Sequence, residues 1–128
     1  MKLLLTGSTG FLGSALQKKL KDHLVILTSR SDEIANSPRF FKKNISSKEN
    51  FSDCLNDVEV IIHTAARVHQ MNDLADDPHK EFMETNCFGT LNLAEQAAKA
   101  GVKRFIFISS IKVNGEQSHS ARPLSFDD

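Results

Sequence analysis

Three glycines near the N-terminus, Gly7, Gly10 and Gly13, are spaced in a way that suits phosphate binding. They follow a short apolar run and open a segment whose apolar residues have helical spacing. A glycine-rich turn between a strand and a helix lets backbone approach a pyrophosphate, and the first helical N–H groups, here of Phe11 and Leu12, favour the anion. The turn therefore predicts a dinucleotide site. No Gly-Lys-Ser/Thr follows, which excludes a P-loop.

The residues after the second apolar run bear on which dinucleotide fits. An acid about 20 residues beyond the glycines would accept hydrogen bonds from the ribose 2′-OH of NAD. Here Ser29 and Arg30 come first, and Asp32 follows. A hydroxyl and a guanidinium suit a 2′-phosphate, since Arg binds phosphate with a planar fork of donors. The cofactor is therefore NAD or NADP, with NADP slightly favoured and an NAD ribose on Asp32 as the alternative.

Strand-length apolar runs alternate with helical patterns along the chain. The patterns predict strands at 2–6, 24–28, 39–43, 58–63 and 103–109, and helices at 11–21, 46–55 and 78–100. Ser46 and Glu49 form the capping-box pattern for the second helix. Asp77, Pro78 and Gly101 supply the N-cap, the first-turn proline and the C-cap of the third. The alternation predicts an α/β fold, a Rossmann-like doubly wound parallel sheet with helices on both faces, as one NAD(P)-binding domain over residues 1–128.

The composition limits the classes of partner that the chain is expected to bind. Sixteen basic and sixteen acidic side chains cancel, so no charge surplus points to nucleic acid or an anionic membrane. No apolar stretch approaches the ~18 residues of a membrane span. Cys54 and Cys87 lie far apart without CxxC spacing, and we expect free thiols rather than a disulfide or a metal site. These features predict a cytoplasmic protein.

Five segments in order resemble the extended branch of the short-chain dehydrogenase/reductase superfamily, the NAD(P)-dependent sugar-nucleotide epimerases and dehydratases of the UDP-glucose 4-epimerase type. The segments are TGSTGFLG at 6–13, HTAAR at 63–67, NCFGTLNL at 86–93, FIFISS at 105–110 and VNGE at 113–116. They are similar to the TGxxGFxG turn, the H-x-A-A segment, the N-x-x-G-T-x-N-L helix and the F-x-S-S-x-x-V-Y-G-D/E run of that family. Asn114 replaces the usual Tyr of the last run.

The resemblance also implies roles for single residues. Asn44 and Ile45 stand where the family holds the adenine with Asp-Leu or Asp-Ile, and Asn86 would hydrogen-bond backbone near the active site. Ser110 falls on the catalytic Ser/Thr. The residues expected to bind the cofactor are Gly7, Thr9, Gly10, Phe11, Leu12, Gly13, Ser29, Arg30, Asn44, Ile45, Ala65, Ala66, Arg67, Asn86 and Ser109.

The family's proton chemistry is done by a Tyr and by a Lys four residues later, but this chain contains no tyrosine. The resemblance therefore implies the N-terminal portion of a larger enzyme, inactive by itself. The parent would transfer hydride at C4 of a nucleoside-diphosphate sugar, as an epimerase first and a 4-keto reductase second. A 4,6-dehydratase is disfavoured, because no Thr-Asp-Glu follows the fifth predicted strand. The resemblance also implies a homodimer as a possible state, since the family often dimerises through the helix at 78–100 and the helix that would follow Asp128.

Two other hypotheses stay open. A non-catalytic dinucleotide sensor of the same fold would share the glycine turn and lack the catalytic residues. A complete small flavodoxin-like protein is the third hypothesis and the least favoured, because the polar end after Val113 leaves uncovered the sheet edge where ligands sit.

Overall fold

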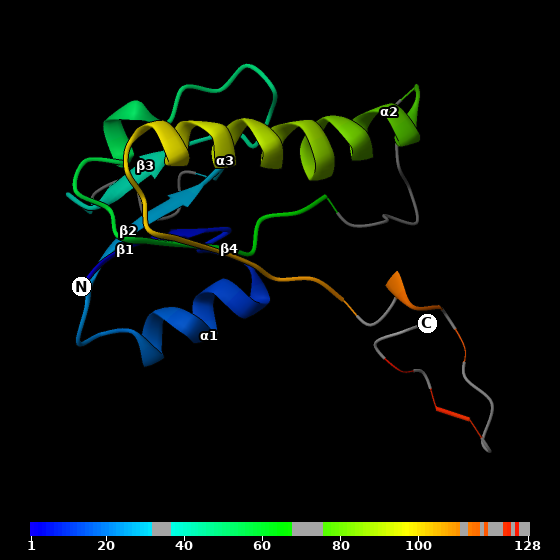
Figure 1. Cartoon of the computed structure of the whole chain (residues 1–128), viewed down its shortest axis with the longest axis horizontal. Coiled ribbons are helices and arrows are strands. Elements are labelled where there is room, and N and C mark those ends of the chain that lie inside the picture. The colour runs from blue at the N-terminus through cyan, green and yellow to red at the C-terminus, as the bar shows by residue number, and fades with distance from the viewer. Residues whose placement is uncertain are drawn as a thin grey trace.

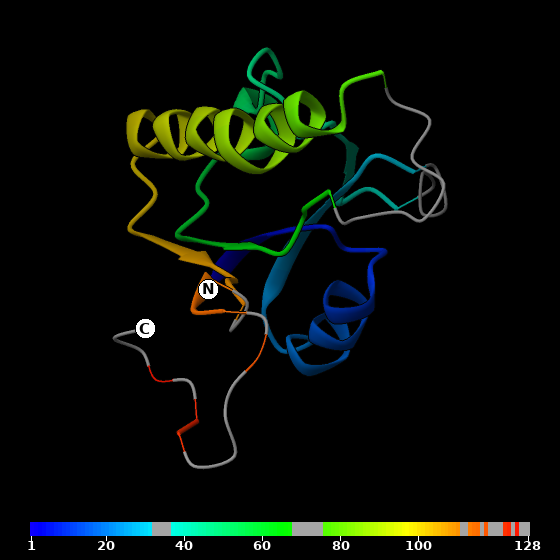
Figure 2. The ribbon, with the colours of Figure 1, turned by 90° about the vertical axis from the view of Figure 1, so that its right-hand side faces the viewer.

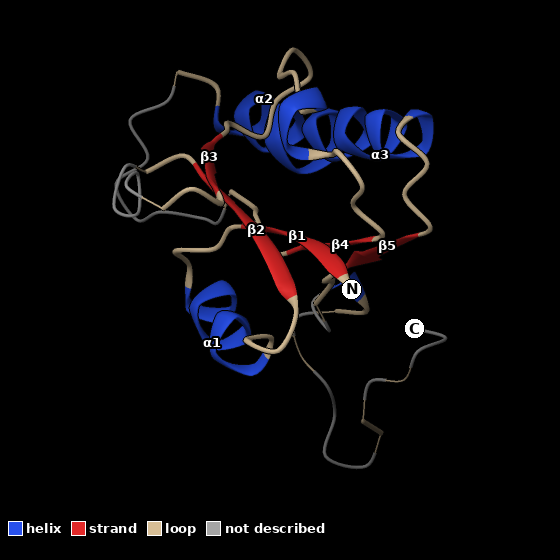
Figure 3. Cartoon of the chain, turned by 90° about the vertical axis from the view of Figure 1, so that its left-hand side faces the viewer, coloured by secondary structure: helices blue, strands red, loops and turns tan. Residues whose placement is uncertain are grey.

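A computed structural model of the chain describes residues 1–31, 37–67, 76–110, 113–115, 117, 122, 123 and 125. Its centre is one parallel sheet of β1 (Lys2–Thr6), β2 (Leu24–Ser29), β3 (Phe40–Lys42), β4 (Val60–His63) and β5 (Arg104–Phe107) (Figure 1). The strands lie in the order β3-β2-β1-β4-β5 (Figure 3). The chain moves outward to one side of β1 with β2 and β3, and to the other side with β4 and β5. Such a reversal of strand order leaves a crevice at the carboxyl ends of the strands.

Helices cover both faces of this sheet, as the alternating pattern predicts. α1 (Phe11–Lys19) lies on one face, and the helix made of α2 (Pro78–Phe82), η2 (Met83–Gly89) and α3 (Thr90–Lys99) lies on the other (Figures 2 and 3). The predicted Rossmann-like fold is confirmed. The strands at 39–43, 58–63 and 103–109 are each shorter than the sequence pattern indicates.

The ends of the long helix form as its sequence predicts. The Asp77 carboxylate accepts the Lys80 N–H at 3.1 Å. At the other end Gly101 has φ +82°, its N–H donates to Ala98 O, and the next N–H, of Val102, donates to Ala97 O. This pair of bonds is a Schellman motif, which needs a left-handed residue at the position of Gly101. Between these ends, the π-helical segment η2 was not anticipated from the sequence.

The helix predicted at 46–55 is wrong, because only a 3₁₀ turn, η1 (Ser52–Cys54), forms there. A capping box would require the Glu49 carboxylate to accept the N–H of Ser46. Instead Glu49 accepts the N–H of Asn44 at 2.9 Å, on the other side of Ser46. The carboxylate therefore stabilises a loop rather than the first turn of a helix.

The hydrophobic core lies between the sheet and α3. Leu4 pairs with Ile26 of β2 and with Ile61 of β4, and all three side chains are buried against Leu93 and Ala97. The loop that replaces the predicted helix completes this core with Ile45, Phe51, Cys54, Leu55 and Val58.

The opposite face and the β5 edge are more open. Phe11 is 98% exposed, and Phe107 is 54% exposed although it lies in β5. Cys54 and Cys87 are free thiols, as predicted, and burial raises the pKa of Cys54 to about 11. Within the described ranges, no helix is long and apolar enough to cross a membrane.

Candidate functional site

A cavity of about 280 Å³ opens at the carboxyl ends of β1, β2 and β4. Its walls come from the glycine turn, the end of β2, the loop after β3, the loop after β4 and the long helix. The lining residues are Gly7, Thr9, Gly10, Phe11, Leu12, Gly13, Thr28, Ser29, Arg30, Ser31, Lys43, Asn44, Ile45, Thr64, Ala65, Ala66, Arg67 and Thr85. This is the place at which open α/β sheets bind ligands.

The floor of the cavity is the glycine turn, which is folded tightly on itself. Gly7 has φ +64°, and the N–H of Gly10 donates to Gly7 O at 3.0 Å. A Cβ on Gly13 would lie 2.0 Å from the same carbonyl oxygen, and a Cβ on Gly7 would lie 2.8 Å from the N of Ala65. Gly7 is therefore required by its positive φ and by the loop after β4, and Gly13 by the backbone of the turn itself.

Gly10 differs from the other two glycines because its surroundings are more open. It is exposed, its φ is −73°, and a Cβ on it would meet only Gly7 O, at 3.3 Å. Gly10 is also the N-cap of α1 and makes no side-chain cap, and the first turn of the helix holds no acidic residue. The first N–H groups of a helix have no partner within it, so those of Phe11 and Leu12 present donors and a positive dipole end to the cavity. The arrangement fits an anion.

A chain of hydroxyls joins the turn to the end of β2. The Thr9 and Ser29 hydroxyls lie 2.8 Å apart, and the Ser29 hydroxyl also accepts the N–H of Ser31 at 3.2 Å. Two cations stand at this end of the cavity, on Arg30 and Lys43. The Lys43 side chain is only 11% exposed, and its ammonium lies 2.8 Å from the Asp53 carboxylate, so its charge is balanced locally. Arg30 is exposed and available to a ligand phosphate in this corner.

The wall after β4 is clamped by the long helix. Asn86, in η2, accepts the backbone N–H of Arg67 at 2.8 Å and donates to its carbonyl oxygen at 2.9 Å. The Arg67 guanidinium lies 5.8 Å from the centre of the Phe82 ring, a cation–π contact. The small side chains of Ala65 and Ala66 leave this side of the cavity open.

His63 lies just beneath this wall and is almost fully buried, with 1% exposure. Its Nδ1 is 2.7 Å from the Thr6 hydroxyl and its Nε2 is 2.9 Å from the Thr90 hydroxyl. Burial lowers its pKa to about 4, which makes the ring neutral near pH 7. The neutral imidazole thus links β1, β4 and α3 and does not line the cavity.

Most of the predicted cofactor residues converge on this cavity. Asn86, Ser109 and Ser110 do not line it: Asn86 acts on the backbone of Arg67, while Ser109 and Ser110 are exposed beyond the end of β5. Sequence reasoning missed five lining residues, namely Thr28, Ser31, Lys43, Thr64 and Thr85. All five adjoin predicted site residues along the chain. Thr85 is placed by the π-helical segment, for which the sequence offers no local signal.

Comparison with known proteins agrees with this architecture. The UDP-glucose 4-epimerase of Vibrio cholerae is 42% identical over 130 residues, which cover 98% of this chain and 40% of that protein. The UDP-glucose 4-epimerase of Thermotoga maritima, solved with UDP-glucose, superposes with a TM-score of 0.70 and 30% identity, over 93% of this chain and 41% of that one. The UDP-glucuronic acid 4-epimerase of Bacillus cereus, solved with NAD, gives a TM-score of 0.74 and 26% identity, over 93% and 43%.

The chain thus spans about two fifths of the length of these relatives. A family model described as the NAD dependent epimerase/dehydratase family matches residues 3–127. The match extends over almost the whole sequence and includes the glycine turn, the clamped wall and the strand that precedes Ser110. The chain therefore belongs to the NAD dependent epimerase/dehydratase family.

Proposed function

We propose that this chain is the dinucleotide-binding portion, residues 1–128, of an NAD(P)-dependent sugar-nucleotide epimerase or 4-keto reductase that acts at C4 of a nucleoside-diphosphate sugar. The observation that carries the proposal is the cavity, in which the glycine turn, the polar end of β2 and the open Gly10 face meet. The Vibrio cholerae relative favours epimerisation. The parent enzyme is cytoplasmic and dimerises through the long helix, on which Phe88 and Leu91 are about half exposed.

The lining residues fit a dinucleotide by their chemistry. The N–H groups of Phe11 and Leu12 would hold the pyrophosphate, with Gly10 leaving room for it. Asn44 and Ile45 would lie beside the adenine. The backbone of Ala65, Ala66 and Arg67 would lie beside the other half of the dinucleotide. When bound, the dinucleotide supplies a hydride acceptor and donor, while these residues orient it and exclude water.

Binding without turnover is the first test. Calorimetric titration of the 128 residues with NAD and NADP should give saturable binding. The same protein mixed with UDP-glucose and NAD should give no turnover above a buffer control, because the sequence holds no tyrosine to act as the base. A folded chain that binds neither dinucleotide would refute the proposal.

A second candidate is a non-catalytic NAD(P)-binding sensor of the same fold, which would share the glycine turn and lack the catalytic residues. The discriminating observation is the reading frame that follows Asp128. A Tyr-x-x-x-Lys motif within roughly 10–25 residues supports the enzyme, as in the family this chain resembles. Binding of NAD(P) in a protein without that motif supports the sensor.

Ser110 is the proposed catalytic hydroxyl, and its substitution separates chemistry from binding. In a chain that also carries the Tyr-x-x-x-Lys helix, Ser110→Ala should lower kcat by about 100-fold, since it removes one donor from the developing alkoxide. The Kd of the dinucleotide should stay the same, because Ser110 does not line the cavity. Steady-state rates with a UDP-sugar provide the measurement, and an unchanged kcat would show that another residue holds this role.

Arg30 should decide between the two cofactors. Arg30→Asp is expected to raise the Kd of NADP more than tenfold and to leave that of NAD nearly unchanged, because it removes a charge-assisted contact worth ~1.5–3 kcal/mol. Calorimetry with both dinucleotides measures the effect. The matched control is Arg39→Asp, an exposed position outside the cavity that changes the net charge equally. Equal losses for NAD and NADP would assign Arg30 no contact with the 2′-phosphate.

A further inference from the structure

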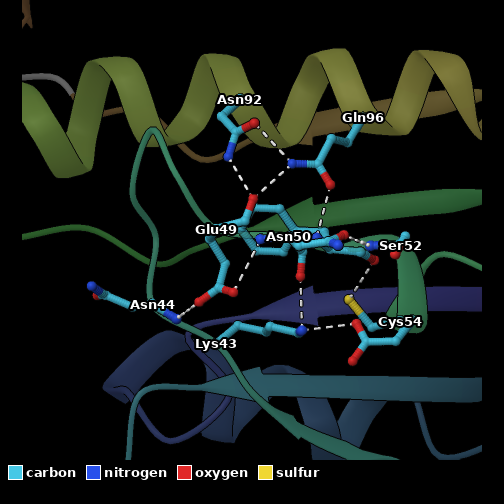
Figure 4. Close-up of polar contacts among 10 residues, drawn as sticks. Lys43, Asn44, Glu49, Asn50, Ser52, Cys54, Asn92 and Gln96 are labelled. Carbon is cyan, nitrogen blue, oxygen red and sulfur yellow. Dashed lines mark hydrogen bonds and ion pairs between the residues drawn. The ribbon is translucent and has the colours of Figure 1, made fainter.

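The loop at 43–51 supplies Lys43, Asn44 and Ile45 to the cavity, although it contains no helix or strand. A segment without regular structure cannot satisfy its own backbone polar groups, and side chains from elsewhere must do so. Figure 4 shows where these partners come from: two amide side chains of α3, Asn92 and Gln96, reach down onto the loop.

Asn92 and Gln96 make a connected set of hydrogen bonds to the loop backbone. The Asn92 amide donates to Ser46 O and to Glu49 O, both at 2.9 Å. The Gln96 amide donates to Glu49 O and to the Asn92 side-chain oxygen, both at 2.8 Å, and its own oxygen accepts the N–H of Phe51 at 2.8 Å. Phe51 is fully buried, so the loop is tied to the core at the same point.

The same helix face makes a third contact one turn earlier. A Cβ on Gly89 would lie 2.7 Å from Ile45 Cγ2 and 2.8 Å from the carbonyl carbon of Ile45, so the helix backbone rests directly on the loop there. Gly89, Asn92 and Gln96 follow at helical spacing and face one side. The loop is therefore held along its length by one stripe of the long helix.

Glu49 connects this stripe to the cavity wall. Its backbone carbonyl accepts from both amides, while its carboxylate accepts the N–H of Asn44 at 2.9 Å. Movement of Glu49 would therefore move Asn44, which lines the cavity. Neither Asn92 nor Gln96 lines the cavity itself.

We propose that Asn92 and Gln96 are positioning residues for the adenosine end of the dinucleotide site. By fixing Glu49 they fix the place of Asn44 and Ile45, and through these the affinity for the adenosine half of the cofactor. This inference rests on the proposed function, since it assigns a ligand to that same wall.

The test is titration with ADP-ribose, which carries the adenosine half and the pyrophosphate. Gln96→Met keeps a long helix-forming side chain but removes every hydrogen bond of the Gln96 side chain. It should raise the Kd of ADP-ribose about tenfold, which lies in the upper part of the range for substitutions of residues that do not touch the ligand. Asn92→Ala should also raise the Kd of ADP-ribose, and it replaces Gln96→Met in the test if that variant does not fold. The Asn44 amide should exchange its hydrogen faster in both variants.

Two controls distinguish positioning of the adenosine wall from a general contribution of Asn92 and Gln96 to stability. Ala98→Gly, at an exposed position of α3, lowers helix stability without touching the loop and should leave the Kd unchanged. Asn44→Ala removes the Asn44 side chain but keeps the backbone N–H that Glu49 accepts. In this background Gln96→Met should raise the Kd less than in the unsubstituted chain, because only the influence that passes through Ile45 remains.

Unchanged affinity in folded variants, or independent effects in the double variant, would overturn the inference. Failure of the proposed function appears differently, as an unsubstituted chain that binds neither NAD nor ADP-ribose, and it would overturn both.

Discussion

Replacing Gly13 by alanine should cost the protein about 3 kcal/mol of its free energy of unfolding, at the upper end for overpacking. The added Cβ would lie 2.0 Å from Gly7 O, 2.8 Å from Gly7 C and 2.9 Å from Ser8 Cα. All three are backbone atoms, and Gly7 has no room to retreat because it abuts Thr64 and Ala65. Urea unfolding followed by far-ultraviolet circular dichroism measures the change, since the chain has no tryptophan or tyrosine to report by fluorescence.

Gly10→Ala is the matched control within the same turn. At φ −73° the backbone suits alanine, and the new Cβ would meet only Gly7 O, at 3.3 Å, a tight contact but far milder than the one at Gly13. This variant should be destabilised much less than Gly13→Ala but bind NAD(P) more weakly, because its methyl group points into the space kept for the pyrophosphate. Equal destabilisation by both substitutions would show that close backbone approach at Gly13 does not limit the fold.

Stability should fall steeply as the pH decreases from 7 to 5, and His63 should account for much of the loss. Burial lowers its pKa from 6.5 to about 4, so the unfolded chain binds the proton more readily than the folded one. The contribution of His63 is therefore complete above about pH 6.5 and declines as the pH falls toward 4. A shift of that size corresponds to about 3 kcal/mol in total, of which about 2 kcal/mol is lost between pH 7 and pH 5.

Denaturant unfolding at several pH values between 5 and 7 tests this expectation. His63→Gln should be less stable at pH 7, where it lacks the bonds to Thr6 and Thr90, but its stability should depend much less on pH in this range. His79→Gln, on the exposed first turn of α2, is the control for replacing a histidine as such. A steep profile that persists in His63→Gln would assign the acid sensitivity to other groups.

Local signals in the sequence were sufficient for the parts of the site that are built locally. Much of the glycine turn depends on local features, the positive φ of Gly7 and the approach of Gly13 to Gly7 O. Asp77, Pro78 and Gly101 likewise mark the ends of the long helix by their own chemistry. Buried parallel strands are apolar throughout, so the sheet was also readable from its sequence.

The loop at 43–51 could not be predicted in this way. Ser46 and Glu49 have the spacing of a capping box, but the amides of Asn92 and Gln96, more than forty residues later, compete for the same backbone. The cavity residues Thr85 and Lys43 could not be predicted from the sequence for a related reason. Thr85 depends on the π-helical turn, and the orientation of Lys43 depends on Asp53 and on the carbonyl of Asn50.

The π-helical segment η2 has a consequence for insertions and deletions. A π turn holds more residues than an α turn, so removing one residue between Met83 and Gly89 would let the segment relax into regular α-helix. The wide turn absorbs the extra residue, so the helix on either side of such a deletion should keep its orientation about the axis. Removing Leu91 from the regular helix α3 would instead rotate one side of the helix against the other by about 100°. Either Asn86 would then leave Arg67, or Asn92 and Gln96 would leave the loop. A deletion scan along this helix should thus separate its two tasks, clamping one wall of the cavity and supporting the other.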